Sequence, residues 1–123
     1  MTRPESRSVM LYGIRNCDRI KKARAWLNTR GVACQFHDYR TQGLDEALLR
    51  GWVTELGWEA LINRQGQTWR RLDLALRNGM DEAQAIRVML DNPSIIRRPL
   101  LDTGGQRYLG FSDAYYAAIF DAS

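Results

Sequence analysis

The stretch "YGIRNCDRIKKAR", residues 12–24, places one cysteine among five basic side chains and a single acid. An apolar, strand-like run ends near Gly13, and a helical pattern begins beside Cys17. The first N–H groups of a helix have no intrahelical partner, and together with the positive end of the helix dipole they stabilise an anion. This position therefore favours the thiolate of Cys17, which is the nucleophilic form. A small, partly buried cysteine without chemistry is the alternative.

Two strands and a helix are predicted to hold this junction. Residues 9–14 form a short apolar run, typical of a buried strand, and residues 32–39 have the aromatic and β-branched character of a second strand. Between them, four residues fall on one face of a helix: Ile20, Ala23, Trp26 and Leu27. The strand–helix–strand order predicts a parallel pair with a right-handed crossover.

A block of helices is predicted between about residues 44 and 92. Four hydrophobic residues recur every four positions at its start: Leu44, Leu48, Trp52 and Leu56. Thr68 is predicted to cap a second helix that ends at Asn78. Asp81 and Gln84 have the spacing of a capping box, which predicts a third helix.

Residues 99–111 are predicted to form a β-hairpin around "TGG", and Ser112 is predicted to cap a final helix. The element order is then β-α-β, a block of helices, and β-β-α. This is the order of a thioredoxin-like α/β fold with a helical insertion. We expect one domain over residues 9–123, and a disordered tail over the polar residues 1–8.

The composition of the chain argues against several classes of function. The 123 residues include only two cysteines, and 45% of them are hydrophobic. No apolar run approaches the ~20 residues of a membrane span, and the polar N-terminus is not a secretory signal, so no membrane partner is expected. Basic and acidic residues are interspersed despite the net charge of +4, so no nucleic-acid partner is expected either. So few cysteines favour a reducing, cytoplasmic setting.

Several segments together resemble a known family. "YGIRNCDRIKKARAWL" is similar to the nucleophile loop of the ArsC/Spx family, the glutaredoxin-dependent arsenate reductases and their relatives. "FHDYRTQGL", "TWRRLD" and "IIRRPLL" resemble later segments of the same family, especially its YffB-like branch, in the expected order from Leu11 to Phe120. The resemblance implies a thioredoxin-like fold and a reactive, catalytic Cys17.

The residue three positions after Cys17 sets this chain apart from part of the family. Spx and thioredoxins carry Cys-x-x-Cys, whereas Ile20 occupies the second position here. A single-thiol mechanism needs an outside thiol to complete the cycle. We therefore expect glutathione or a glutaredoxin as partner, with glutathione as co-substrate and no bound cofactor.

Arginines supply the expected anion-binding groups. Arg98 precedes Pro99, and a residue before proline is pushed to extended geometry. The resemblance implies a cis bond at Pro99 beside the cysteine loop, and an oxyanion bound by Arg98 and Arg64. The planar fork of a guanidinium suits such anions. Arg15 and Asn16 are expected to shape the pocket. Exposed loop arginines without this role are the alternative.

A third arginine of the family would fall near the end of the second hairpin strand. The best-matching position in this chain is Gly110, and the nearby Arg107 aligns with a different residue. The resemblance therefore implies an incomplete oxyanion site and little arsenate turnover.

Cys34 shares a strand face with Val32 and Phe36, which favours an inert buried thiol, with a resolving partner for Cys17 as the alternative. His37, the only histidine, falls on the opposite face of the strand. No metal site is expected, because no second histidine or cysteine cluster accompanies it. A catalytic pair of Cys17 with His37 stays open.

The leading hypothesis is a thiol-disulfide oxidoreductase in which Cys17 attacks a small anionic or thiol-adduct substrate and glutathione resolves the adduct. Gly13 is expected to shape the loop, although it could also simply end the strand. The rival hypothesis is a non-catalytic regulator that binds RNA polymerase, as Spx does.

Overall fold

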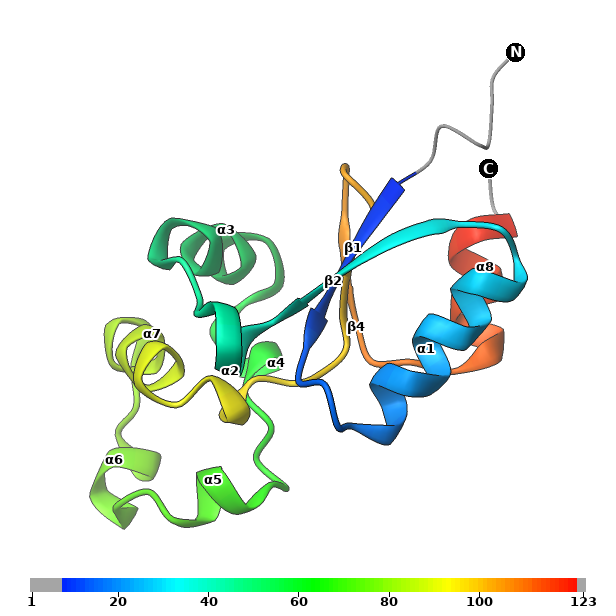
Figure 1. The fold of residues 1–123 in the computed structure, drawn as a ribbon. Coiled ribbons are helices and arrows are strands. Elements are labelled where there is room, and N and C mark those ends of the chain that lie inside the picture. The colour runs from blue at the N-terminus through cyan, green and yellow to red at the C-terminus, as the bar shows by residue number, and fades with distance from the viewer. Residues whose placement is uncertain (1–7, 122–123) are drawn as a thin grey trace. The chain divides into compact units, whose positions relative to one another are not determined.

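The computed structural model describes residues 8–121, which form two compact units. The sheet unit contains the described residues up to Asp38 and from Arg98 onward, and the helical unit is Tyr39–Arg97. Figure 1 labels the elements of both units.

The sheet unit is built on four strands: β1 (Ser8–Gly13), β2 (Ala33–Asp38), β3 (Leu100–Asp102) and β4 (Arg107–Leu109). Their order is β2-β1-β3-β4, with β1 parallel to β2 and antiparallel to β3, which in turn is antiparallel to β4. The β-α-β and β-β-α orders are thus confirmed, and the topology is thioredoxin-like.

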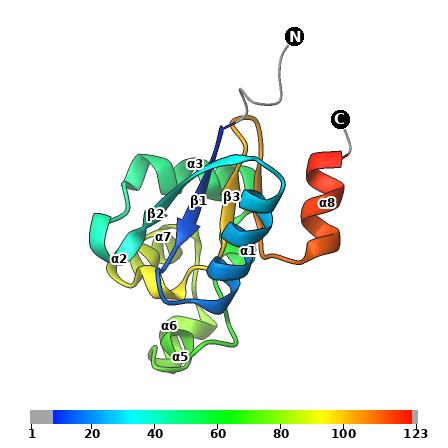
Figure 2. The same cartoon turned by 45° about the vertical axis from the view of Figure 1, so that its right-hand side comes forward.

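Helices α1 (Asp18–Thr29) and α8 (Asp113–Asp121) pack on one face of this sheet, as Figure 2 shows. Side chains alternate along a strand, so every second residue of β1 faces these helices. The shared core consists of Val9, Leu11, Ile20, Ala23, Leu27, Leu101 and Tyr116, all buried. Ser112 caps α8 as predicted, because its Oγ accepts a hydrogen bond of 3.0 Å from the N–H of Tyr115.

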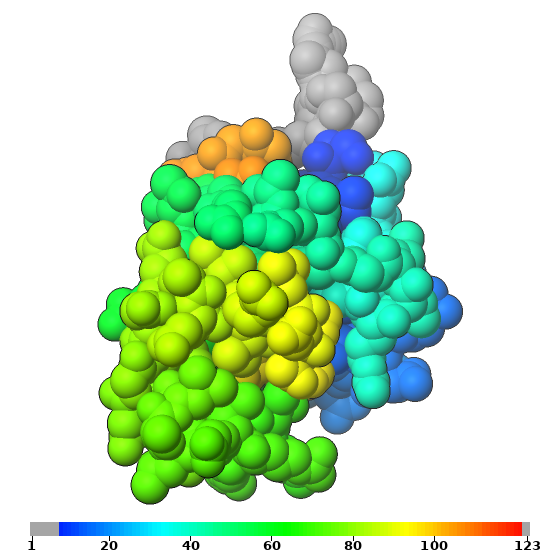
Figure 3. Space-filling view, turned by 90° about the vertical axis from the view of Figure 1, so that its left-hand side faces the viewer, coloured from blue at the N-terminus to red at the C-terminus, as the bar shows by residue number. Residues whose placement is uncertain are grey.

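The helical unit consists of short helices: α2 (Tyr39–Gln42), α3 (Glu46–Leu56), α4 (Trp58–Leu61), α5 (Gln67–Arg70), α6 (Leu74–Asn78), α7 (Glu82–Asp91) and the 3₁₀ helix η2 (Pro93–Ile95). Its core forms where α7 packs on α3, α4 and η2. Figure 3 shows its surface, with α3 at the top, α7 in the middle and α5 and α6 below. The helical segment extends beyond both predicted limits.

The four-residue repeat that predicts the first inserted helix does not match the buried side of α3. Of the four-residue repeat only Trp52 is buried, and its buried companions are Leu49 and Val53. The reason is geometric, because a repeat of four drifts around a helix of 3.6 residues per turn, whereas spacings of three and four keep to one side.

The prediction of a single helix from Thr68 to Asn78 was wrong, because the chain forms two short helices there, α5 and α6. The hydroxyl of Thr68 lies 3.0 Å from that of Ser94 instead of capping a helix, and Gly66 occupies the N-cap. Leu72 N–H donates to the carbonyl of Trp69, which tightens the last turn of α5.

The capping box at the start of α7 is confirmed. Gln84 N–H donates to the Asp81 carboxylate at 2.9 Å, and Asp81 N–H donates back to the Gln84 side chain at 3.1 Å.

The described part of the chain, residues 8–121, contains no helix long and apolar enough to cross a membrane. The predicted tail lies outside the described residues except for residue 8, with which β1 begins.

Among the glycines of the sheet unit, Gly13 has the least room for a side chain. A Cβ there would overlap Cδ1 of the fully buried Ile20 and lie 2.9 Å from its Cγ1. We expect Gly13→Ala to lower the free energy of unfolding by about 1–3 kcal/mol, the usual cost of overpacking. Gly51→Ala is the matched control, because this exposed glycine within α3 has no atom near its Cβ position. The free energy of unfolding of the Gly51→Ala variant should rise by about 0.5–1 kcal/mol, because alanine is more stable than glycine within a helix. Urea unfolding followed by circular dichroism measures both, and equal stability of the two variants would contradict the argument.

Candidate active site

Cys17 is the N-cap residue of α1, as the sequence predicts. Its φ and ψ of −104° and 130° are extended, its thiol makes no capping hydrogen bond, and it is a free, half-buried cysteine. The first helical bond is donated by Lys21 N–H to the Cys17 carbonyl at 3.1 Å. The N–H groups of residues 18–20 therefore precede the hydrogen-bond ladder and are oriented to stabilise an anion at this terminus.

Charged side chains around the thiol differ in what they contact. Arg15 and Asn16 are exposed and directly precede Cys17 in the chain. Asp18 is an acidic residue in the first turn of α1, at the same terminus. The guanidinium of Arg24 lies 5.0 Å from the ring centroid of Phe36, at the β2 side of the helix.

The loop that carries Cys17 is held by Asp38, the last residue of β2. The N–H of Arg15 donates to Oδ2 of Asp38 at 3.2 Å, and Asp38 is 3% exposed. In the parallel register Asp38 lies opposite Gly13, where the loop begins. Our sequence analysis missed this carboxylate. The available signal was an acid near the end of the second predicted strand, because neighbouring parallel strands end at the same edge of a sheet.

Gly13, Arg98 and Pro99 lie at the same end of the sheet as the helix terminus. Tyr12 pairs with Leu100 across the antiparallel strands, so the next position along β1 places Gly13 beside Pro99. A Cβ on Gly13 would lie 3.6 Å from Cβ of Arg98. Gly13 therefore does more than end a strand, because its missing side chain admits both Arg98 and the first turn of α1. The Arg98–Pro99 bond is cis, which confirms that expectation.

Arg64 belongs to the helical unit, in the loop between α4 and α5. It is exposed, and its Cζ lies 5.8 Å from the ring centroid of Trp58 and 5.5 Å from that of Trp69. The other predicted site residues belong to the sheet unit: Gly13, Arg15, Asn16, Cys17, Arg98 and Pro99.

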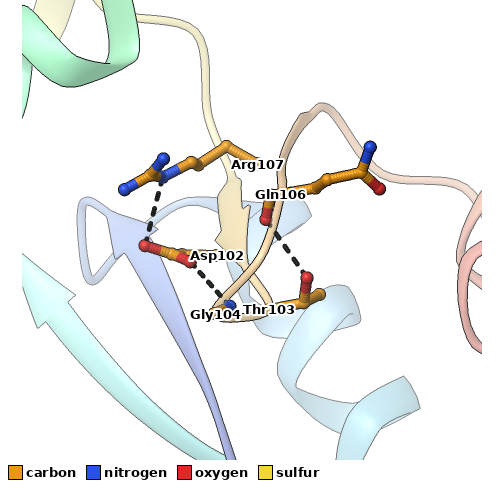
Figure 4. Close-up of polar contacts among 5 residues, drawn as sticks. All are labelled: Asp102, Thr103, Gly104, Gln106 and Arg107. Carbon is orange, nitrogen blue, oxygen red and sulfur yellow. Dashed lines mark hydrogen bonds and ion pairs between the residues drawn. The ribbon is translucent and has the colours of Figure 1, made fainter. Parts of the chain in front are cut away.

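Gly110 occupies the cis-proline end of the hairpin. Its N–H donates to the Pro99 carbonyl at 2.9 Å, and its φ of +86° is one that glycine adopts readily and other residues do not. Arg107 lies at the other end of β4, where its Nε is 3.3 Å from Oδ2 of Asp102, as Figure 4 shows. The residue that bonds to the Pro99 carbonyl is therefore a glycine and not an arginine. The side chain of Arg107 is paired with Asp102 within the hairpin.

Cys34 is too far from Cys17 to be its resolving partner in this fold. It pairs with Val9, and from there to Gly13 the strand rises by about 13 Å at roughly 3.3 Å per residue. A disulfide requires Cα atoms about 4.4–6.8 Å apart. Cys34 is half-buried rather than fully buried, and burial raises the pKa of its thiol, with a smaller opposing effect from Arg24.

His37 pairs in register with Tyr12, and the centroids of the two rings are 5.2 Å apart. Cys34 and Phe36 instead pack against the core under α1 and α8, so the predicted opposite orientation of His37 is confirmed. Within residues 8–121, no group of three or more histidines, cysteines and acids could hold a metal ion. The pairing of His37 with Cys17 stays a prediction.

Known proteins resemble this chain over nearly its whole length. A solved structure named YffB is 49% identical and superposes with a TM-score of 0.84, covering 89% of this chain and 96% of its own. An arsenate reductase (ArsC) related protein from Brucella melitensis is 44% identical, with a TM-score of 0.79 and coverage of 94% and 96%. The global transcriptional regulator Spx of Streptococcus mutans is 32% identical over 85% of this chain and 77% of its own length.

The sequence pattern of the ArsC family matches residues 12–119, from the last residues of β1 into α8. This range contains Cys17, Arg64, Arg98 and the cis Pro99. The chain therefore belongs to the ArsC family.

Proposed function

We propose that this protein is a thiol-disulfide oxidoreductase that uses Cys17 as its single nucleophile and glutathione as its reductant. The observation that carries the proposal is the position of Cys17 at the N-cap of α1. Arg98 and the cis Pro99 lie at the same end of the sheet, next to Gly13 at the end of β1. Membership of the ArsC family and the similarity to an arsenate reductase related protein support an oxidoreductase role. Both cysteines are free thiols, which suits a reducing, cytoplasmic setting.

The proposed cycle has two thiol–disulfide exchanges. In the first, the Cys17 thiolate attacks the glutathionyl sulfur of a mixed disulfide, forms a Cys17–glutathione disulfide and releases the substrate as a thiolate. In the second, the thiolate of another glutathione attacks the glutathionyl sulfur of that adduct. Cys17 leaves as thiolate with the electron pair of the broken bond, and oxidised glutathione is the product. A glutaredoxin can take the place of glutathione in the second exchange.

Arg98 and Arg64 are the proposed anion-binding residues. A substrate that carries glutathione presents carboxylates, and a guanidinium binds a carboxylate through two parallel N–H bonds. Nε of the half-buried Arg98 is shielded from solvent, which strengthens its electrostatic interactions. Arg15 and Asn16 are proposed to complete the polar surroundings of the thiol.

A regulator that binds a protein partner is the second candidate, favoured by the identity to Spx. The residue at position 20 argues against an Spx-like redox switch in this chain. Ile20 is fully buried in the core and contacts the strand at Gly13, so this position has a packing role instead of a thiol. Recovery of RNA polymerase with a protein whose Cys17 is unreactive would favour the regulator.

The reaction with oxidised glutathione tests the proposed function. We expect wild-type protein to form a mixed disulfide at Cys17 within minutes, and reduced glutathione to remove it, because the helix terminus stabilises the attacking and leaving thiolate. Peptide mass spectrometry locates the adduct. Modification of Cys34 with Cys17 left intact would refute the assignment of the nucleophile.

Cys34 provides the matched control for that experiment. Cys34→Ala should react as fast as wild type, because Cys34 lies outside disulfide reach of Cys17. In Cys17→Ser the remaining thiol should be alkylated slowly at neutral pH. Its pKa is raised by burial, so its thiolate, and hence its alkylation rate, should increase only as the pH rises into the alkaline range.

Arg98 and its neighbour Arg97 form a second matched pair. Arg98→Ala should slow the reduction of a glutathionylated peptide roughly ten- to hundredfold, because a hydrogen bond to a charged group contributes about 1.5–3 kcal/mol. Arg97→Ala should be near wild type, since its side chain is exposed and only its N–H is bonded, to the Leu61 carbonyl at 2.7 Å. A coupled glutathione reductase assay measures both. Equal rates for the two variants would remove Arg98 from the site.

Arsenate is expected to be a poor substrate. Gly110 stands where a third guanidinium would bind the oxyanion, and loss of one such contact weakens the anion interaction by roughly ten- to hundredfold. The coupled assay with glutathione, glutaredoxin and arsenate, run beside a glutathionylated peptide, should give much faster turnover of the peptide. Efficient arsenate reduction that depends on Cys17 would mean that another cation replaces the missing arginine.

A further inference from the structure

The guanidinium of Arg64 lies close to two tryptophan rings that the proposed function does not yet use. We propose that Trp58 and Trp69 are positioning residues, which hold Arg64 in the orientation that binds a carboxylate or a tetrahedral oxyanion of the substrate. This inference rests on the anion-binding role given to Arg64 under the proposed function.

The contacts come from both sides of one loop. Trp58 is the first residue of α4 and Trp69 lies in α5, and both are half-buried. Cζ of Arg64 is 5.8 Å from one ring centroid and 5.5 Å from the other, within the roughly 6 Å at which a cation and an aromatic face attract. An exposed arginine samples many rotamers, and contact with two rings reduces that freedom before any ligand binds.

Main-chain bonds also hold the loop itself. Asn63 N–H donates to the Ile95 carbonyl at 2.8 Å, and an isolated β-bridge joins Ile62 to Ile96. The side chain of Asn63 accepts from Gln65 N–H at 3.1 Å, which closes a tight turn around Arg64. The base of the Arg64 side chain is therefore fixed by the backbone, and its end by the two rings.

Contact with an aromatic ring leaves N–H groups of a guanidinium available. The ring attracts the flat face of the cation, whereas the five N–H donors lie in the plane of the group. Arg30 provides an example in this chain, because its Cζ lies 4.4 Å from the Trp26 centroid while its Nη1 binds Oδ1 of Asp121 at 3.2 Å. Arg64 has two rings and, within residues 8–121, no carboxylate partner of its own, so its N–H edge remains for a ligand.

Binding of two unreactive probes to the full-length protein, measured by calorimetry, tests the proposal. S-methylglutathione offers carboxylates and inorganic phosphate offers a tetrahedral oxyanion, so the two titrations separate the sources of the anion. We expect Trp58→Leu and Trp69→Leu each to weaken binding about two- to fivefold, the effect of one exposed cation–π contact. The corresponding Phe variants, which keep an aromatic face, should recover most of this loss.

Two further comparisons distinguish positioning from general damage. In an Arg64→Ala background the Leu variants should cause no additional loss, because the rings act through Arg64. Arg30→Ala, which removes a stacked arginine elsewhere, should leave both affinities unchanged. In nuclear magnetic resonance spectra, ring currents should shift the Nε–H signal of Arg64, and each Trp→Leu change should move it toward the position of a free arginine.

Several results would overturn the inference. The first is wild-type affinity for the probes in folded Trp58→Leu and Trp69→Leu variants, and the second is an equal loss of affinity when these changes are made in the Arg64→Ala background. The third is an Nε–H signal of Arg64 that does not move in the Leu variants, and the fourth is no binding of either probe to the wild-type protein. If a Leu variant fails to fold, the Phe variants and the Arg64 signal in wild type decide the question. An unreactive Cys17 with the binding pattern intact would count against the oxidoreductase alone and would support the positioning role.

Discussion

The close approach of three segments at Gly13 is the constraint on which the site depends. The end of β1, the first turn of α1 and the residue before the cis proline meet where only a hydrogen atom fits. Because Ile20 is fully buried against this point, α1 must begin at the end of the strand, and its N-terminus must face the loop that carries Cys17. The buried carboxylate of Asp38 holds the same loop from the neighbouring strand. Packing therefore determines where the thiol lies, and the dipole of α1 then acts on it.

The two cysteines lie in different environments within one unit. Cys17 is the N-cap residue of α1, with N–H donors ahead of it, whereas Cys34 lies on the edge strand β2 and packs against the hydrophobic core of the sheet unit. Desolvation raises the pKa of Cys34, which makes it a poor nucleophile at neutral pH. The difference arises from position along the sheet, because the first cysteine follows the carboxyl end of β1 and the second pairs near its amino end.

Features encoded by neighbouring residues could be predicted from the sequence. The caps at Ser112 and Asp81 depend on side chains within three positions, and the place of Cys17 follows from a strand pattern next to a helix pattern. The break between α5 and α6 could not be found in this way, because Thr68 is engaged by Ser94, which is distant in sequence.

The same limit applied to the site. The proposed roles of Arg98 and Arg64 come from the family resemblance. The contacts of Asp38 and of the two tryptophans depend on strand register and on loop packing, which the spacing of residues in the sequence does not encode. A strand pattern that ends in an acid, next to a predicted strand-to-helix loop, is a sequence signal for such a contact.

The burial of Ile20 has a consequence for how this protein can be oxidised. With a hydrophobic side chain at position 20 and Cys34 beyond disulfide reach, Cys17 cannot close a ring within its own chain. A disulfide at Cys17 is therefore always a conjugate with a second molecule, which changes the mass and, for glutathione, the net charge of the protein. The lifetime of such a conjugate would depend on the concentration of free thiols around it, because only a second thiol can release Cys17 by exchange.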